Sequence, residues 1–269
     1  MRNPSDSIGI NVTLQLEEYD RSTVMQDGYP EDLAYVHDVG HRDYALQSLP
    51  GILSILAQCE IREGLVVDLG CGSGLSAQAL TQAHYQVLGV DLSGALIEIA
   101  RHRVPEAEFR VESLFQTDIP SCYAVISIGE CLNYLFDSDN NVLTLVKLFD
   151  RIYNALIPGG VFIFDIAEPG QVMQGTTTKS FSEGSDWIVL VEKEEDLRRS
   201  ILTRRMTTLR NVDGQYRRED VVHQMRLYSA VDVAQMLRNA GFRIQIIHQY
   251  GEFELPPAHV AFVARKPKA

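Results

Sequence analysis

Apolar residues recur along the chain in two alternating patterns, one helical and one typical of buried strands. Between residues 31 and 57 they recur at helical spacing, with a break at Gly40. From residue 65 onward, short runs dominated by apolar residues at 65–69, 87–90, 123–128 and 161–166 alternate with helix-like stretches. Such runs are typical of parallel strands buried on both faces. The pattern predicts an α/β fold with a doubly wound, mostly parallel sheet.

The final third of the chain departs from this alternation and then returns to it. Residues 171 to 226 contain three strand-like runs, and the dipeptide Asp213-Gly214 between the last two is typical of a hairpin turn. A helix follows, with Ser229 as its cap and Gly241 at its end, and then two closing strands at 243–248 and 259–265. We therefore expect an antiparallel β insertion between the fifth strand and the next helix.

The first buried strand runs directly into a glycine-rich loop. Residues 65–74 read L-V-V-D-L-G-C-G-S-G, and the three glycines can take positive φ and let a ligand approach the backbone. The helix that follows presents free N–H groups to a polar part of such a ligand. Asp91 ends the next strand, where a carboxylate can accept both hydroxyls of a ribose. Either a nicotinamide dinucleotide or S-adenosylmethionine fits this arrangement.

The spacing of the glycines helps to decide between these two ligands. The dinucleotide fingerprint G-x-G-x-x-G or A requires a small residue at position 75, where this chain has Leu75. The segment V-V-D-L-G-C-G-S-G, followed by V-D-L-S, instead resembles the first two motifs of class I S-adenosylmethionine-dependent methyltransferases. The segment L-I-P-G-G-V-F-I-F-D resembles the late motif of that family. The resemblance covers about residues 65 to 265 and implies a seven-stranded Rossmann-like sheet whose last strand is antiparallel.

The resemblance also implies which residues hold S-adenosylmethionine. The loop glycines would surround the amino-acid end of the donor, Asp68 would orient the loop, Asp91 would bind the ribose, and Leu92 and Leu114 would enclose the adenine. The family usually has an acidic residue where this chain has a serine, and a hydroxyl is a poorer acceptor than a carboxylate. The full predicted set is Asp68, Gly70, Cys71, Gly72, Gly74, Asp91, Leu92, Ser113, Leu114 and Gly129.

The acceptor side is less clearly marked in the sequence. In the family, helices before the first strand cover the donor pocket, which makes Tyr35 and His37 candidates for the substrate site. Glu130 and Asn133 are predicted catalytic residues, because they follow the fourth strand at the edge where open α/β sheets bind ligands. His223 is the predicted general base, because an imidazole titrates near neutrality, although a structural role fits it equally well. No cluster of carboxylates indicates a metal.

Charge and cysteine content narrow the classes of partner. The chain has 24 Lys+Arg against 36 Asp+Glu, a net charge of -12 that opposes binding to nucleic acid. A basic cluster at Arg198, Arg199, Arg204 and Arg205 is either a solvated strand face or a contact for an acidic substrate group. Four cysteines without metal-ligand spacing and no visible signal pattern indicate a cytoplasmic protein. No apolar run approaches the roughly 20 residues of a membrane helix.

Together these features predict three regions and one activity. Residues 1–60 form an N-terminal helical segment whose first 30 or so residues are mobile, 61–170 and 227–269 form the donor-binding domain, and 171–226 cover the substrate. The predicted activity is methyl transfer to a nitrogen or oxygen of a small molecule. A non-catalytic S-adenosylmethionine-binding protein and a nicotinamide-dependent oxidoreductase remain alternatives. The sequence leaves open the acceptor, the atom methylated and whether the chain forms a homodimer.

Overall fold

A computed structural model describes residues 28–268 of the chain. The mobility expected for residues 1 to about 30 therefore concerns, for the most part, residues outside the described range. Within that range, no helix has the length and apolar character needed to cross a bilayer.

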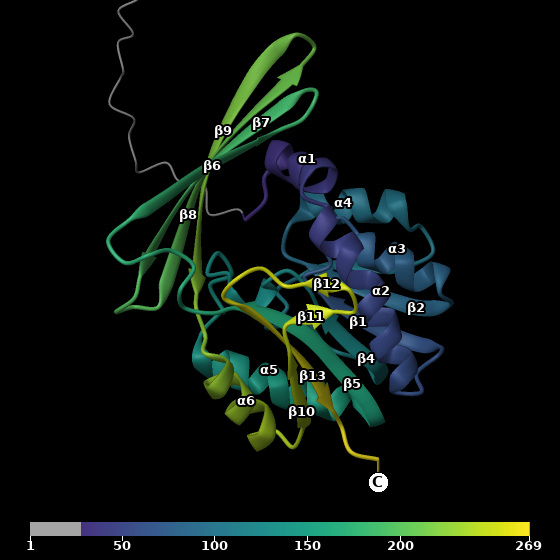
Figure 1. The fold of residues 1–269 in the computed structure, drawn as a ribbon. Helices are drawn as coiled ribbons and strands as arrows, with labels where there is room; N and C mark the ends of the chain where they lie inside the picture. The colour runs from purple at the N-terminus through teal and green to yellow at the C-terminus, as the bar shows by residue number, and fades with distance from the viewer. Residues whose placement is uncertain (1–27, 269) are drawn as a thin grey trace, which may run out of the picture.

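The described residues form one seven-stranded sheet in the order β10-β13-β5-β4-β1-β2-β3 (Figure 1). The pairs from β5 to β3 are parallel, whereas β13 is antiparallel to both β5 and β10. This confirms the doubly wound sheet with an antiparallel last strand. Its strands are β1 (Gly64–Leu69), β2 (Tyr85–Asp91), β3 (Glu108–Val111), β4 (Cys122–Ser127), β5 (Leu156–Ala167), β10 (Arg243–Ile247) and β13 (His259–Arg265).

Helices cover both faces of this sheet because successive strand residues point to opposite sides. Val67 packs in the core beneath α5 and α6, while its neighbour Val66 packs beneath α2 and α3. Both valines are fully buried, which explains why the strand segments are so rich in apolar residues. The covering helices are α2 (Asp43–Gln58), α3 (Leu75–Gln82), α4 (Gly94–Arg103), α5 (Val142–Ala155) and α6 (Ala230–Asn239).

The insertion between β5 and α6 forms a separate four-stranded antiparallel sheet, here called the insertion sheet. Asp213 and Gly214 form a two-residue hairpin with φ of 53° and 80°, as the dipeptide predicted. The sequence did not indicate the first strand, because it is an exposed edge strand with little apolar character. The strands are β6 (Thr177–Glu183), β7 (Trp187–Asp196), β8 (Ile201–Val212) and β9 (Gln215–Arg226).

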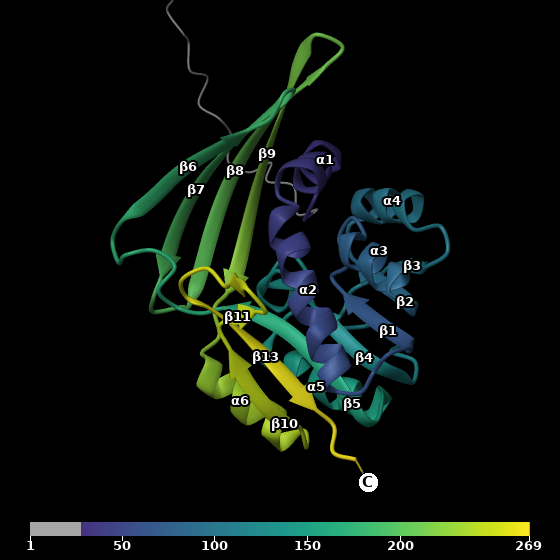
Figure 2. The ribbon, with the colours of Figure 1, turned by 45° about the vertical axis from the view of Figure 1, so that its right-hand side comes forward.

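Helix α1 (Glu31–Gly40) lies between the insertion sheet and α4 (Figure 2). Gly40 allows a close approach, since a Cβ there would lie 2.3 Å from a ring carbon of Trp187 in β7. The buried Asp32 carboxylate accepts from Arg210 at 2.9 Å and from Arg217 at 2.6 Å, both on the insertion sheet. These contacts attach α1 to the insertion sheet. A short helix, η1 (Cys131–Asn133), and a two-stranded hairpin of β11 (Gln249–Tyr250) and β12 (Phe253–Glu254) complete the fold.

Candidate functional site

A cavity of about 560 Å³ lies at the carboxyl ends of β1, β2 and β4, and the insertion sheet closes its far side. Its walls come from the loop after β1, the end of β2, the segment after β4, α1, α2 and strands β6 to β9. Topological switch points and carboxyl strand ends are where open α/β sheets bind ligands. The cavity is therefore the candidate site.

The glycine-rich loop, residues 70–74, is fixed by hydrogen bonds that its backbone amides donate to the end of β2. The amides of Gly70 and Cys71 donate to the Val90 carbonyl at 2.7 and 3.0 Å. The Gly72 amide donates to the Asp91 carboxylate at 2.9 Å. A Cβ on Gly72 would have no protein atom within 4 Å, so Gly72 leaves open space that a side chain would fill.

The other predicted loop residues play packing roles. A Cβ on Gly70 would lie 2.4 Å from the Cys131 sulfur, so glycine is required there by close packing. Gly74, with φ of 79°, is the N-cap of α3. Cys71 is buried, and burial raises the pKa of its thiol. Among the predicted loop residues, Gly70 and Gly72 face the cavity directly.

Two aspartates lie at the ends of the strands next to the glycine-rich loop, and of these Asp91 lines the cavity whereas Asp68 does not. Asp91 accepts from the amides of Gly72 and Ser93, and burial raises the pKa of its carboxyl despite these bonds. Asp68 is 2% exposed, and one of its carboxylate oxygens has no hydrogen-bond partner among the described residues. Burial and the nearby Asp91 raise the pKa of Asp68 to about 8. The loop is held by Val90 and Asp91, and Asp68 makes no hydrogen bond to it.

An apolar wall follows the Asp91 side of the cavity, formed by Leu92, Leu96, Leu114 and Phe115. The Ser113 hydroxyl does not face the cavity but donates to the Asp137 carboxylate at 2.6 Å. Asp137, unlike Ser113, is one of the cavity-lining residues and is 8% exposed. The acidic residue that the family usually has beside Leu114 is thus replaced by Asp137, which comes from the segment after β4.

The turn after β4 places Gly129 and Glu130 at the cavity wall. Glu130 has a φ of 63°, a conformation that is uncommon for a residue with a side chain. The buried Asp165 carboxylate holds the turn, since it accepts from the Gly129 amide at 3.0 Å and the Glu130 amide at 2.7 Å. Asp165 also accepts from the Tyr250 hydroxyl at 3.1 Å, and burial raises its pKa to about 6. This strained backbone directs the Glu130 carboxylate toward the insertion sheet.

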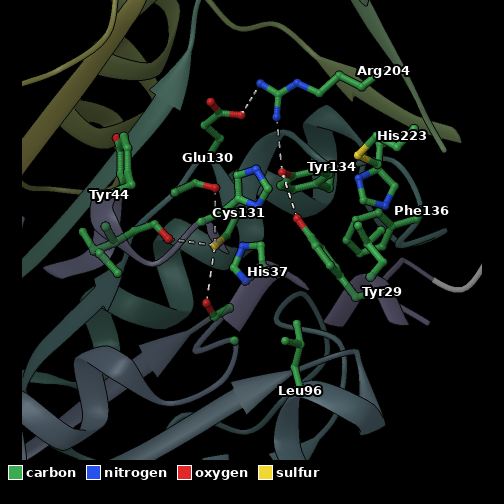
Figure 3. Close-up of a pocket in the computed structure, with 18 of the residues that line it drawn as sticks. Tyr29, His37, Tyr44, Leu96, Glu130, Cys131, Tyr134, Phe136, Arg204 and His223 are labelled. Atoms are coloured by element: carbon green, nitrogen blue, oxygen red, sulfur yellow. Dashed lines mark hydrogen bonds and ion pairs between the residues drawn. The ribbon is translucent and has the colours of Figure 1, made fainter. Parts of the chain in front are cut away.

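Glu130 forms a three-membered charged network with Arg204 and His259. Arg204 in β8 donates to one carboxylate oxygen at 2.8 Å, as Figure 3 shows, and His259 Nε2 donates to the other. His259 Nδ1 lies 2.9 Å from the Pro257 carbonyl, so both ring nitrogens face acceptors and the ring is an imidazolium. Burial would raise the pKa of Glu130, but Arg204 and His259 outweigh it and lower the pKa to about 2. Glu130 is therefore a fixed carboxylate, and both of its oxygens are engaged by cationic partners.

His223 and His37 lie on the same side of the cavity, among aromatic rings. The His223 ring is 5.0 Å from the Tyr29 ring, 5.4 Å from Tyr134 and 5.2 Å from Phe136. Its Nε2 donates to the Gly28 carbonyl, which leaves Nδ1 unprotonated, and burial lowers its pKa to about 4. Burial lowers the pKa of His37 to about 4 as well. Both rings are neutral at physiological pH (Figure 3 shows their positions).

Two residues that were predicted to contact the methyl acceptor, Asn133 and Tyr35, do not line the cavity. Asn133 is fully buried, and its side-chain amide donates to the carbonyls of Ala167 and Arg226 while its oxygen accepts from the Ala167 amide. It fastens η1 to β5 and β9 and does not line the cavity. Tyr35 packs under the Arg210 guanidinium, 3.6 Å from the ring centroid, and its hydroxyl donates to Asp186 at 3.1 Å. Tyr35 therefore joins α1 to the insertion sheet.

Sequence reasoning missed several residues that line the cavity, above all Lys193, Tyr134, Asp137 and His259. None of them belongs to a motif, and each reaches the cavity through the tertiary fold. The basic cluster was the one available signal. Two members of this cluster lie on opposite faces of the insertion sheet. Arg204 faces the cavity, whereas Arg205 is exposed and pairs with Glu194 at 3.4 Å. Among residues 28–268, no group of three or more potential ligand side chains could hold a metal.

These features fit S-adenosylmethionine. Gly72 and Gly129 leave open space where a Cβ would stand, and Asp68 offers a buried oxygen that lacks a partner. Asp91 and the apolar wall provide a place for a nucleoside. The doubly wound sheet with this site at its switch point defines an adenosyl-binding α/β enzyme.

Comparisons with known proteins agree with this class. Residues 66–160 match the family model described as a methyltransferase domain. A protein of Geobacillus sp. (strain WCH70) named as a methyltransferase is 27% identical over 209 residues, covering 75% of this chain and 84% of the relative. The 18S rRNA (guanine-N(7))-methyltransferase of Mus musculus is 23% identical and matches 59% of each chain. The sugar N-methyltransferase KedS8 from Streptoalloteichus sp. has the same fold, with a TM-score of 0.71, 18% identity and coverage of 100% of this chain and 99% of its own.

The chain is a class I S-adenosylmethionine-dependent methyltransferase, and S-adenosylmethionine is its cofactor. The relatives and the solved structure named above are methyltransferases, not nicotinamide-dependent oxidoreductases.

Proposed function

We propose that the protein transfers a methyl group to a nitrogen or oxygen of a small molecule held beneath the insertion sheet. One observation carries this proposal: a single cavity is lined both by Gly72 and Asp91 of the donor side and by Val191 and Met206 of the insertion sheet. A cavity of about 560 Å³ is within the range of small-molecule sites. The neighbour KedS8, a sugar N-methyltransferase, matches the whole chain and supports the same class of acceptor.

The donor would be held by side chains at or after the carboxyl ends of β1, β2, β3 and β4. Asp91 would accept the two ribose hydroxyls with the lone pairs that Gly72 and Ser93 leave free. Asp68 would face the cationic amino-acid end, where a positive charge would supply the partner that its buried oxygen lacks. Asp137, oriented by Ser113, would accept from the adenine amino group. Leu92 and Leu114 would enclose the ring.

When bound, S-adenosylmethionine supplies a sulfonium methyl group, which passes to the acceptor by in-line displacement and leaves S-adenosylhomocysteine. The chain's own contribution is to hold the acceptor in line and to exclude water, and such positioning can supply roughly 7–11 kcal/mol. The apolar face of the insertion sheet, with Val189, Val191 and Met206, serves the exclusion of water.

An acceptor that must lose a proton requires a base, and the neutral imidazoles are placed to provide one. His223 carries its proton on Nε2, so Nδ1 has a free lone pair. His37 Nδ1 is buried without a partner. We assign the base to His223, with His37 beside it. Glu130 orients Arg204 and His259 rather than taking a proton, and Asn133 and Tyr35 support the walls from outside.

The relative that methylates 18S rRNA raises the question of an RNA acceptor. The formal charge of -12 opposes the approach of a phosphate backbone, and the insertion sheet with α1 covers the cavity. We therefore favour the small molecule.

The test incubates the purified protein with methyl-labelled S-adenosylmethionine and either the dialysable fraction of a cell extract or total RNA. We expect the labelled methyl group to pass to a compound of the dialysable fraction and not to RNA. Label in RNA alone would contradict the proposal. His223→Ala should reduce turnover while leaving S-adenosylhomocysteine affinity unchanged, and Arg205→Gln is the control because Arg205 lies on the exposed face.

A further inference from the structure

Three side chains form a row across the face of the insertion sheet that meets the cavity. Lys193 in β7 is the cross-strand partner of Arg204 in β8, and Arg204 is the partner of His223 in β9. Directly opposed residues point to the same face of a sheet, and all three line the cavity. The parallel row two residues away along these strands is uncharged, with Val191 in β7 opposite Met206 in β8 and Ser180 in β6.

The pairing of Lys193 with Arg204 is electrostatically unfavourable by itself. Like charges directly opposite each other destabilise a sheet. Within residues 28–268, no hydrogen bond or ion pair reaches the Lys193 ammonium. Burial and then the neighbouring Arg204 lower the pKa of the half-buried Lys193 ammonium, and the charge of Glu130 opposes them only in part.

Glu130 does not neutralise the row. Both of its carboxylate oxygens are already engaged, one by Arg204 and the other by His259. Because the His259 ring is an imidazolium, this end of the cavity has three cationic groups and one carboxylate. Arg204 also retains an unused donor, since its Nε is buried without a hydrogen-bond partner.

We propose that Lys193 and Arg204 bind an oxyanion of the acceptor, a carboxylate or a phosphate, so that the substrate is an anionic small molecule. This inference rests on the proposed function, because it concerns the acceptor end of the same cavity. The anion supplies the counter-charge that Lys193 lacks and an acceptor for the Arg204 guanidinium. The nucleophilic atom of the same molecule then lies on the side of the cavity nearer the donor loop.

The exposed face of the same strands provides a matched control. Arg205 follows Arg204 directly, points away from the cavity, is 47% exposed in its side chain and pairs with Glu194. Lys193→Gln and Arg205→Gln each remove one positive charge, so they change the total charge equally but remove it from opposite faces of the sheet.

The experiment measures binding of citrate and of inorganic pyrophosphate by calorimetry to the protein saturated with S-adenosylhomocysteine. We expect at least one of the two anions to bind wild type, and Lys193→Gln to weaken that binding about tenfold, the effect of losing a hydrogen bond to a charged group. Arg205→Gln should leave it within about twofold, since exposed charges are screened. Lys193→Arg should retain binding. Citrate and pyrophosphate distinguish a carboxylate from a phosphate site.

Two results would overturn the inference. One is that neither anion binds although S-adenosylhomocysteine does; the other is that Lys193→Gln and Arg205→Gln weaken binding equally. Affinity for S-adenosylhomocysteine is measured in every variant and should not change, which also verifies that each variant is folded. Failure of the wild type to bind S-adenosylhomocysteine would count against the proposed function. Failure of the anions alone to bind would count against this inference, so the two results are distinguishable.

Discussion

The two ends of the cavity differ in charge and in how the chain builds them. The end at which we place the donor is formed by neighbouring segments, with Asp91 at its wall and Asp68 buried at the end of the adjacent parallel strand. The acceptor end is basic and formed by Lys193, Arg204 and His259, which come from three strands of two different sheets. A local motif can therefore specify the cofactor, whereas the acceptor depends on how the insertion sheet is placed.

Glu130 is the residue that joins the two ends, because its backbone is held by Asp165 and its side chain by Arg204 and His259. Glu130→Gln should lower the free energy of unfolding by roughly 3 kcal/mol, because two buried cations lose their counter-charge. Denaturant unfolding measures the change. Glu194→Gln, which breaks an exposed pair, should change it by no more than about 0.5 kcal/mol. Equal effects would show that the network adds nothing to stability.

The same network predicts a pH window. The pKa of Glu130 is lowered from 4.5 to about 2, so its stabilisation is present above pH 4.5 and is lost as the pH falls toward 2. The pKa of His259 is raised above 6.5, so its stabilisation is present below pH 6.5 and is lost as the pH rises through the raised value. The difference in unfolding free energy between wild type and Glu130→Gln should therefore be largest between pH 4.5 and 6.5. A pH-independent difference would exclude the imidazolium.

Asp91→Ala tests the donor end alone. The loss of two hydrogen bonds to a charged acceptor should weaken S-adenosylhomocysteine binding on the order of 100-fold, as measured by calorimetry. Citrate or pyrophosphate binding, measured without the nucleoside, should be unaffected. Because Asp91 also holds the Gly72 amide, Asp91→Asn is the control: it keeps one oxygen for the loop and should lose less affinity. Unchanged donor affinity in Asp91→Ala would contradict the ribose assignment.

Asp68→Asn should separate stability from binding. A carboxyl whose pKa is raised to about 8 destabilises the fold increasingly between its ordinary 3.8 and 8, so its removal should stabilise the free protein at neutral pH. We expect the Tm to rise on the order of 3 °C and the affinity for S-adenosylmethionine to fall. Scanning calorimetry with and without ligand measures both. A fall in Tm together with unchanged affinity would show that Asp68 serves packing alone.

Tyr35→Phe should have the smallest effect. It removes one hydrogen bond to Asp186, worth about 1 kcal/mol or less, and keeps the ring beneath Arg210. Turnover with an identified acceptor should stay at the wild-type level, as a steady-state assay would show. A large loss of turnover would instead support the placement of Tyr35 at the substrate, which the sequence suggested.

Gly72 and Asp91, two of the residues predicted for the donor, line the cavity and are held there by local backbone geometry. Gly72 and Asp91 interact within one strand-loop-helix-strand unit, so their spacing alone carries the signal. Asn133 and Tyr35 were expected beside the substrate, yet each has hydrogen-bond partners far away in the chain. Asp137 illustrates the opposite case, because it reaches the cavity beside Leu114 from a segment in which no motif indicated a ligand contact.

By itself the sequence determined the sheet, the donor loop and the class of enzyme, because alternating burial and glycine placement depend on residues near each other in the chain. Only the tertiary structure decided the acceptor end. The network of Glu130, Arg204 and His259 joins residues 74 and 129 positions apart, and the position of Lys193 depends on strand register. These charged residues are far apart in the sequence and come into contact only in the folded protein. A pattern of neighbouring residues in the sequence therefore cannot predict which of them form pairs.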